Sequence, residues 1–161
     1  MTRAEWYRIF LYIHILSAIV GLGPTFVFGR ITAMGRADPP HSRFATTVVH
    51  KLTITSAMPI AVVIFVSGLG LIWARGYNVW KAEWLLVAMV LFVFGFSFSA
   101  VVIGRLRRRI LDITGAADFE ASEPPAELAK LGRRIAWGGR YLRVSASAIL
   151  YLMIFKGFSP I

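Results

Sequence analysis

Among the side chains of this 161-residue sequence, the imidazole of His14 could carry out the widest range of chemistry. It lies within a long apolar stretch, and an ionisable group inside such a stretch is by default a functional candidate. Steps of three and four residues from it reach Ser17, Ala18 and Gly21, which are small enough to let helices approach closely. The imidazole therefore points into a helix bundle. There it could ligate haem iron or a metal, or it could bond a partner helix and only fix packing, which we favour.

A second ligand for a haem would be expected on a neighbouring helix, and His50 is the residue to test, because two histidines on adjacent helices often hold a b-type haem. His14 lies 15 residues before the inner end of its stretch at residue 29, whereas His50 lies at the inner mouth of the next one. The two differ in depth by about 22 Å, so they cannot share one iron. We therefore expect no cofactor and no metal site. The open alternative is a haem that uses His14 as its one histidine ligand or is shared with another subunit.

Several kinds of catalysis are excluded by the residues that are missing from the sequence. The chain has no cysteine, which excludes disulfides, iron–sulfur clusters, thiolate zinc sites and cysteine nucleophiles. Its eight carboxylates all lie outside the long charge-free stretches, whereas proton-coupled pumps usually need an acid within the membrane. We therefore predict that the protein is not an enzyme and has no catalytic residues.

The elements that position these side chains are long apolar helices. Apolar residues make up 57% of the chain, which is outside the range of soluble domains. The charge-free runs 9–29, 52–74 and 84–104 are each about 20 residues long, enough to cross a ~30 Å hydrocarbon layer. A fourth run, 144–155, becomes long enough if Arg143 and Lys156 extend outward from its ends. The sequence predicts an all-α polytopic membrane protein, a single four-helix bundle over 1–161 with spans near 7–29, 52–74, 84–104 and 138–157.

The basic residues predict how the bundle is oriented. The stretch 30–51 holds four Lys or Arg and the stretch 105–143 holds nine, while the opposite side holds far fewer. By the positive-inside rule, both termini lie on the outer, periplasmic side of a bacterial inner membrane. The first connection and the third connection, 105–137, are then cytoplasmic.

The formal charge of +10 raises the question of what the basic residues bind. They bracket the apolar spans and do not form a free basic domain with aromatic platforms, so we exclude nucleic acid. Anionic lipids of the inner leaflet are the expected counter-charge. For the basic helix over 126–142 we favour simple compliance with the topology rule over specific lipid recognition. The residues expected at lipid headgroups are Arg107, Arg108, Arg109, Arg133, Arg134 and Arg140.

Small residues and prolines predict where the helices touch and bend. Small side chains let transmembrane helices approach closely. The residues expected at such contacts are Ser17, Ala18, Gly21, Gly68, Gly95 and Ser99. Pro24 and Pro59 each remove a backbone donor and predict kinks that could bound a small cavity, although prolines of this kind are common in membrane helices.

On these residues the chain resembles the uncharacterised bacterial integral membrane family called domain of unknown function 2269. The resemblance covers nearly the whole length and rests on IHILSAIVGLG at 13–23, VSGLGLIW at 66–73, WLL at 84–86 and LMIFK at 152–156. The first segment is also similar to the opening of four-helix units in CopD-type copper-resistance membrane proteins and haem-binding relatives. The first family implies the fold and has no agreed activity. The second would imply a haem or copper site.

Taken together, these features predict a non-enzymatic inner-membrane protein that is a structural or accessory component of a membrane assembly. We expect it to lie in a homo-oligomer or a larger membrane complex. One alternative is a haem- or metal-binding redox protein that uses His14. Another is a small-molecule permease with a cavity between Pro24 and Pro59.

Overall fold

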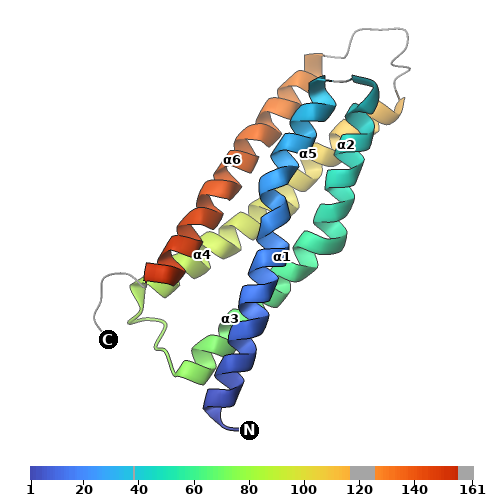
Figure 1. Cartoon of the computed structure of the whole chain (residues 1–161). Coiled ribbons are helices and arrows are strands. Elements are labelled where there is room, and N and C mark those ends of the chain that lie inside the picture. The colour runs from blue at the N-terminus through green and yellow to red at the C-terminus, as the bar shows by residue number, and fades with distance from the viewer. Residues whose placement is uncertain (38, 117–125, 156–161) are drawn as a thin grey trace.

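The structure, a computed structural model, describes residues 1–37, 39–116 and 126–155, and nearly all of them are helical. Two short π-helical segments, η1 and η2, each join a pair of α-helices end to end, so the chain forms long rods that run side by side (Figure 1). The elements are α1 (Arg3–Ala37), α2 (Pro39–Leu52), η1 (Thr53–Ala57), α3 (Met58–Arg75), α4 (Glu83–Phe98), η2 (Ser99–Ile103), α5 (Gly104–Ala116) and α6 (Ala126–Phe155). The predicted all-helical class is confirmed.

Three helical stretches are long and apolar enough to cross a membrane: Arg3–Gly35, His41–Arg75 and Glu83–Gly115. They contain the first three predicted spans and extend well beyond them. The C-terminal helix α6 packs beside them. Its 30 residues are long enough to cross a membrane, but over its described residues it is less apolar than the other three. Its crossing therefore stays a prediction, and residues 156–157 of the predicted fourth span lie outside the described residues.

The predicted connection 105–137 is helical at both of its flanks, while its middle, 117–125, lies outside the described residues. Helix α5 continues to Ala116, and α6 begins at Ala126. Both flanks are stabilised as helices by an apolar cluster, in which Ile110 of α5 is buried with Leu131 and Ile135 of α6. Leu131 and Ile135 are four residues apart, about one helical turn, so both lie on the face of α6 that packs against α5. The two flanks therefore continue the bundle beyond the apolar spans.

The rods associate as two pairs. Helix α1 packs along α3 and α2, and α4 packs against α6, while α2 contacts α5 where the two pairs join. We call this the basic end of the bundle, where α1 and α5 finish and α2 and α6 begin (Figure 1). Toward the opposite end α3 and α4 diverge, and large side chains bridge the space between them. The stacked rings of Phe65 and Phe92, for example, have centroids 5.8 Å apart.

The turn between α3 and α4 holds these diverging helices together. Gly76 ends α3 with a φ of 70°, a left-handed conformation that glycine adopts without a Cβ clash. Its N–H donates to the carbonyls of Ile72 and Trp73. Two residues later the side chain of Asn78 accepts a hydrogen bond from the N–H of Trp80 at 3.1 Å. The helices are thus antiparallel, as a short turn requires, without packing closely along their length.

The α1–α3 pair depends on a close approach at Gly21. This glycine is buried, and a Cβ built on it would lie 2.6 Å from Cγ2 of Ile60. Gly23, two residues on, has nothing within 4 Å of the same built atom. The two glycines therefore share a helix but differ in the space around them.

We expect Gly21→Ala to lower the free energy of unfolding by about 1–3 kcal/mol, because the added methyl forces α1 away from α3. The matched control Gly23→Ala adds the same methyl into open space and should leave stability unchanged or raise it by up to about 1 kcal/mol, since alanine favours helix over glycine. Thermal unfolding of both purified variants in one detergent measures the difference. Equal effects of the two substitutions would contradict the α1–α3 packing described here.

Candidate functional site

His14 is held by the helix that packs against α1. Its Nδ1 lies 3.0 Å from the carbonyl oxygen of Ile64 and 3.1 Å from Oγ of Ser67, both on α3. A Cβ built on Gly68 would lie 3.3 Å from Cε1 of the ring, so any larger residue there would press on the imidazole. The histidine therefore joins α1 to α3, as its small-residue face predicts.

These contacts determine which nitrogen carries the proton. A carbonyl oxygen can only accept, so Nδ1 is the donor to Ile64. The hydroxyl of Ser67 donates to the carbonyl of Val63 at 2.7 Å and can accept from the same Nδ1. The other ring nitrogen, Nε2, then carries a lone pair. In metal-ligating histidines one nitrogen is commonly oriented by a carbonyl in this way, which leaves the other to bind.

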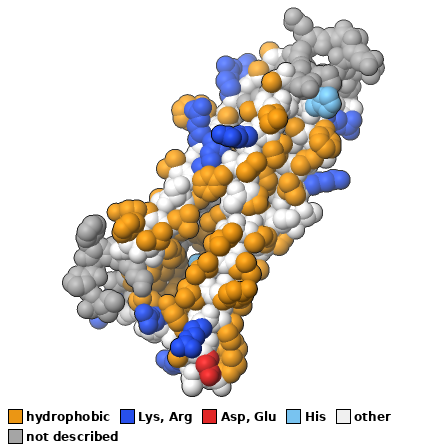
Figure 2. All heavy atoms as spheres, in the orientation of Figure 1, with side chains coloured by type: hydrophobic (Ala, Val, Ile, Leu, Met, Phe, Trp, Pro, Cys, Tyr) orange, Lys and Arg blue, Asp and Glu red, His pale blue; other side chains and the backbone are white. Residues whose placement is uncertain are grey.

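A cavity of about 710 Å³ separates the α1–α3 pair from the α4–α6 pair. Its lining on α1 runs from His14 to Ala33, which at 1.5 Å per residue is about 28 Å. Figure 2 shows the molecular surface hollowed between α1 and the α4–α6 pair, with apolar side chains around the hollow. Most of the lining is apolar. The polar lining residues are His14, Thr25, Arg30, Thr32, Thr53, Ser99, Arg107, Arg140, Arg143 and Ser145.

Both π-helical segments border this cavity. Thr53 and Ala57 of η1 line one wall, and Ser99 and Ile103 of η2 line another. A π-helical turn widens the backbone locally and is frequent at functional sites. Pro59 follows η1 as the second residue of α3, and because it has no N–H it cannot donate a hydrogen bond to the preceding turn of this rod. The interruptions in these two rods therefore coincide with the cavity.

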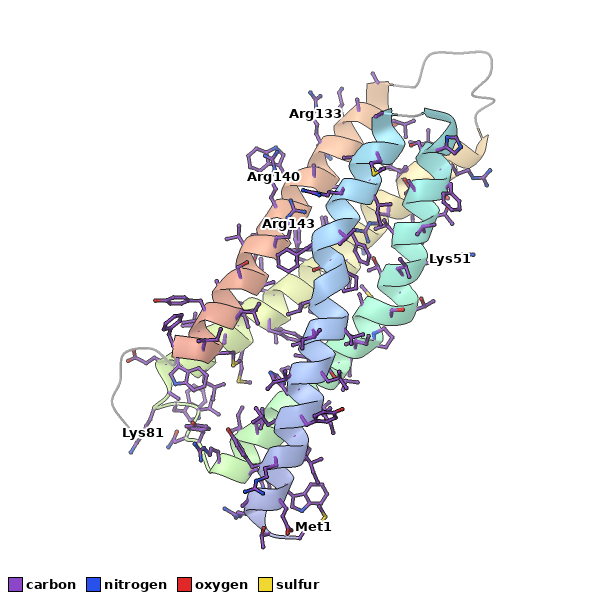
Figure 3. All side chains as sticks on the ribbon, viewed as in Figure 1. Met1, Lys51, Lys81, Arg133, Arg140 and Arg143 are labelled. Carbon is purple, nitrogen blue, oxygen red and sulfur yellow. The ribbon has the colours of Figure 1, made fainter. Side chains whose placement is uncertain are left out.

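Of the four arginines that line the cavity, Arg30 and Arg140 are exposed, whereas Arg107 and Arg143 are half-buried. Nη1 of Arg107 donates to Oγ1 of Thr53 at 2.7 Å, and that hydroxyl donates to the carbonyl of Val49 at 2.7 Å. Nη1 of Arg143 lies 2.7 Å from a Cβ built on Gly29, so its guanidinium fills the gap between α6 and α1. Figure 3 shows Arg143 on the part of α6 that borders α1. Both side chains are half-buried, although each carries a full charge.

The other predicted headgroup arginines lie on the outside of the bundle. Arg109 forms an ion pair with Glu127 at 2.6 Å, with both side chains largely exposed. The guanidinium of Arg140 lies 5.0 Å from the ring centre of Trp137, at the rim of the cavity. Arg108, Arg133 and Arg134 are exposed. The six predicted residues thus divide into one that is partly buried in the cavity, Arg107, and five on the surface.

The remaining histidines lie far from His14. His50 is near the end of α2, 14 residues before Ile64, which is about 21 Å along the helix axis. His41 is in the first turn of α2. Within residues 1–37, 39–116 and 126–155, no group of three or more His, Cys, Asp or Glu could hold a metal ion.

The predicted packing residues lie on the contacts between helices, on the cavity wall, or on both. Gly21 and Gly68 lie at the contact between α1 and α3, and Gly95 is buried on α4 facing Leu142 of α6 at 3.7 Å from its built Cβ. Ala18 and Ser99 line the cavity, and so do Gly21 and Gly95 in part. Ser17 is half-buried on α1.

Sequence reasoning missed Arg143 and Thr53 as cavity residues. Arg143 was expected to extend from the end of an apolar span toward the membrane surface, and its place beside Gly29 of α1 in the cavity lining was not foreseen. A signal was present in Gly139, one turn earlier on α6, whose missing side chain leaves room for a long neighbour. Recognising it requires knowing that α1 lies opposite, which spacing along α6 cannot show.

Similarity to known proteins identifies one family for this chain. No curated protein and no solved structure matches the chain, so the likeness to CopD-type units stays an expectation from the sequence. A family model described as "Predicted integral membrane protein (DUF2269)" matches residues 8–157, which include every described helix in whole or in large part. The chain therefore belongs to this family of predicted integral membrane proteins, as its sequence motifs indicated.

Proposed function

We propose that this protein is a non-enzymatic accessory component of a bacterial inner-membrane assembly that holds an amphipathic molecule between its two helix pairs. The observation that supports it is the long cavity between α1–α3 and α4–α6. Its lining is mostly apolar, and its arginines, Arg30, Arg107, Arg140 and Arg143, lie toward the basic end, a distribution that suits an amphipathic molecule with one charged end. A cavity of this kind inside a bilayer is accessible to membrane lipids and to apolar segments of a partner.

The same proposal includes the membrane arrangement. We propose four crossings, α6 being the fourth, with both termini periplasmic and the basic end cytoplasmic. Support comes from the excess of Lys and Arg in 30–51 and 105–143. Antiparallel neighbouring rods bring both of these stretches to the same end of the bundle.

Single cysteines test this arrangement cleanly, because the chain has none of its own. Trp80→Cys in the α3–α4 turn and Asp112→Cys on α5 both replace exposed side chains at opposite ends. We expect a membrane-impermeant maleimide to label the first in intact spheroplasts and the second only after the membrane is opened. Labelling in the reverse order would contradict the orientation, and labelling of both in intact spheroplasts would contradict the crossing by α4 and α5.

Native mass spectrometry of the protein, extracted from its own membrane in mild detergent, tests the binding role. We expect masses above that of the bare chain, from bound lipid, from a second copy or from a partner chain. A bare monomer under conditions that keep a known membrane complex intact would contradict the proposal.

A haem- or metal-binding role is the second candidate, and the orientation of His14 favours it. Its Nδ1 is engaged by Ile64, which leaves Nε2 as a possible ligand at the cavity wall. If this role is correct, the purified protein shows a Soret band or stoichiometric metal that is lost in His14→Ala. Colourless, metal-free protein from the native membrane would contradict this role and leave His14 as a packing residue.

A further inference from the structure

The arginines that reach into the cavity have no acidic partner in the described part of the chain. Arg107 is hydrogen-bonded to Thr53, a neutral hydroxyl, and Arg143 lies against the backbone of Gly29. The ion pair found among the described residues, Arg109 with Glu127, is on the outer surface. A half-buried guanidinium is costly unless an anion or several acceptors face it. This end of the cavity is therefore electrostatically suited to an anion.

The two side chains converge on the same depth of the bundle. Side chains on a helix lean toward its N-terminus, and α5 and α6 run in opposite directions. Arg107 therefore leans back toward the middle of the bundle, while Arg143 leans toward the basic end. Arg107 contacts Thr53 on η1 and Arg143 contacts Gly29 on α1, and these two elements touch each other. The two guanidinium groups therefore lean toward each other and line the same cavity.

The remainder of the cavity lining is mostly apolar, and the hydroxyl of Thr25 within it donates to the carbonyl of Leu22 in its own helix. Along α1 its lining passes Phe26, Leu22 and Ala18 before reaching His14. One leaflet is half of a ~30 Å hydrocarbon layer, so an acyl chain that starts at the level of Gly29 ends near Ala18, about 16 Å away. The polar group at His14 and Ser67 lies beyond that point.

We propose that the basic end of the cavity binds the phosphate of an anionic phospholipid between Arg107 and Arg143, with an acyl chain lying along the apolar lining. This rests on the proposed function and specifies its ligand. Arginine binds phosphate through paired N–H groups in a fixed geometry. Basic pockets between transmembrane helices on the cytoplasmic side are known to take lipid headgroups. A free phosphate would pair with both arginines, but it has no acyl chain to occupy the apolar part of the cavity.

Surface attraction to anionic lipid makes a different prediction from a cavity site. If diffuse attraction were sufficient, each arginine at the basic end would contribute equally. In a cavity site Arg107 and Arg143 dominate, while exposed arginines on the same helices contribute little. Arg108 is the matched control for Arg107, its direct neighbour on α5, and Arg133 is the control for Arg143 on α6.

The test is native mass spectrometry of the full chain in detergent, with equal amounts of phosphatidylglycerol and phosphatidylethanolamine added. We expect the wild type to retain phosphatidylglycerol preferentially. Arg107→Gln and Arg143→Gln should each lower the ratio of the two bound lipids about fivefold, whereas Arg108→Gln and Arg133→Gln should leave it within about twofold. Arg143→Lys, which keeps the charge but lacks the paired N–H groups, should give a ratio between those of the wild type and Arg143→Gln. An unchanged thermal midpoint identifies variants that remain folded. If one cavity variant does not fold, the other decides.

Three outcomes would overturn the proposal. Bound lipid without preference for phosphatidylglycerol, or four glutamine variants that lower the preference alike, would exclude the cavity headgroup site while leaving the binding role intact. Displacement of phosphatidylglycerol by excess inorganic phosphate would identify a free anion as the ligand. A wild-type chain that retains no lipid would contradict the binding role as well.

Discussion

Gly21 and Gly68 let α1 lie directly against α3, and this close approach governs the rest of the bundle. In lipid, apolar side chains gain little by leaving the solvent for another helix, so association depends on van der Waals packing and on hydrogen bonds between helices. The glycines supply the packing, and His14 adds a bond from α1 to Ile64 and Ser67. With α1 and α3 joined in this way, α4 pairs with α6, and the two pairs enclose the cavity between them.

The basic end shows how one residue type serves two physical roles. Exposed arginines such as Arg108 and Arg133 remain solvated, and their attraction to anionic headgroups is diffuse and screened by salt. Arg107 and Arg143 are half-buried beside a hydroxyl and a glycine backbone. Their charge is less screened there, so an anion within the cavity interacts with them more strongly than one at the surface.

The π-helical segments connect backbone geometry to this site. A π turn contains one residue more than an α turn and widens the backbone locally. Thr53 and Ser99 begin the two π segments, and both line the space between the pairs. Hydroxyls close to a potential ligand are thus obtained without a carboxylate inside the apolar layer.

The sequence by itself determined the all-helical class, three long apolar helices, the inward face of His14 and the family. These depend on composition, run length and residue spacing, which are local properties. It placed the helical face of Gly21 correctly because small residues recur at helical spacing. Only the tertiary structure decided that α3 and α4 diverge, that η1 and η2 interrupt their rods, and that Arg143 lies beside Gly29 of α1. Each of these depends on which helix lies opposite, and spacing along one helix carries no information about the identity or the distance of its neighbour.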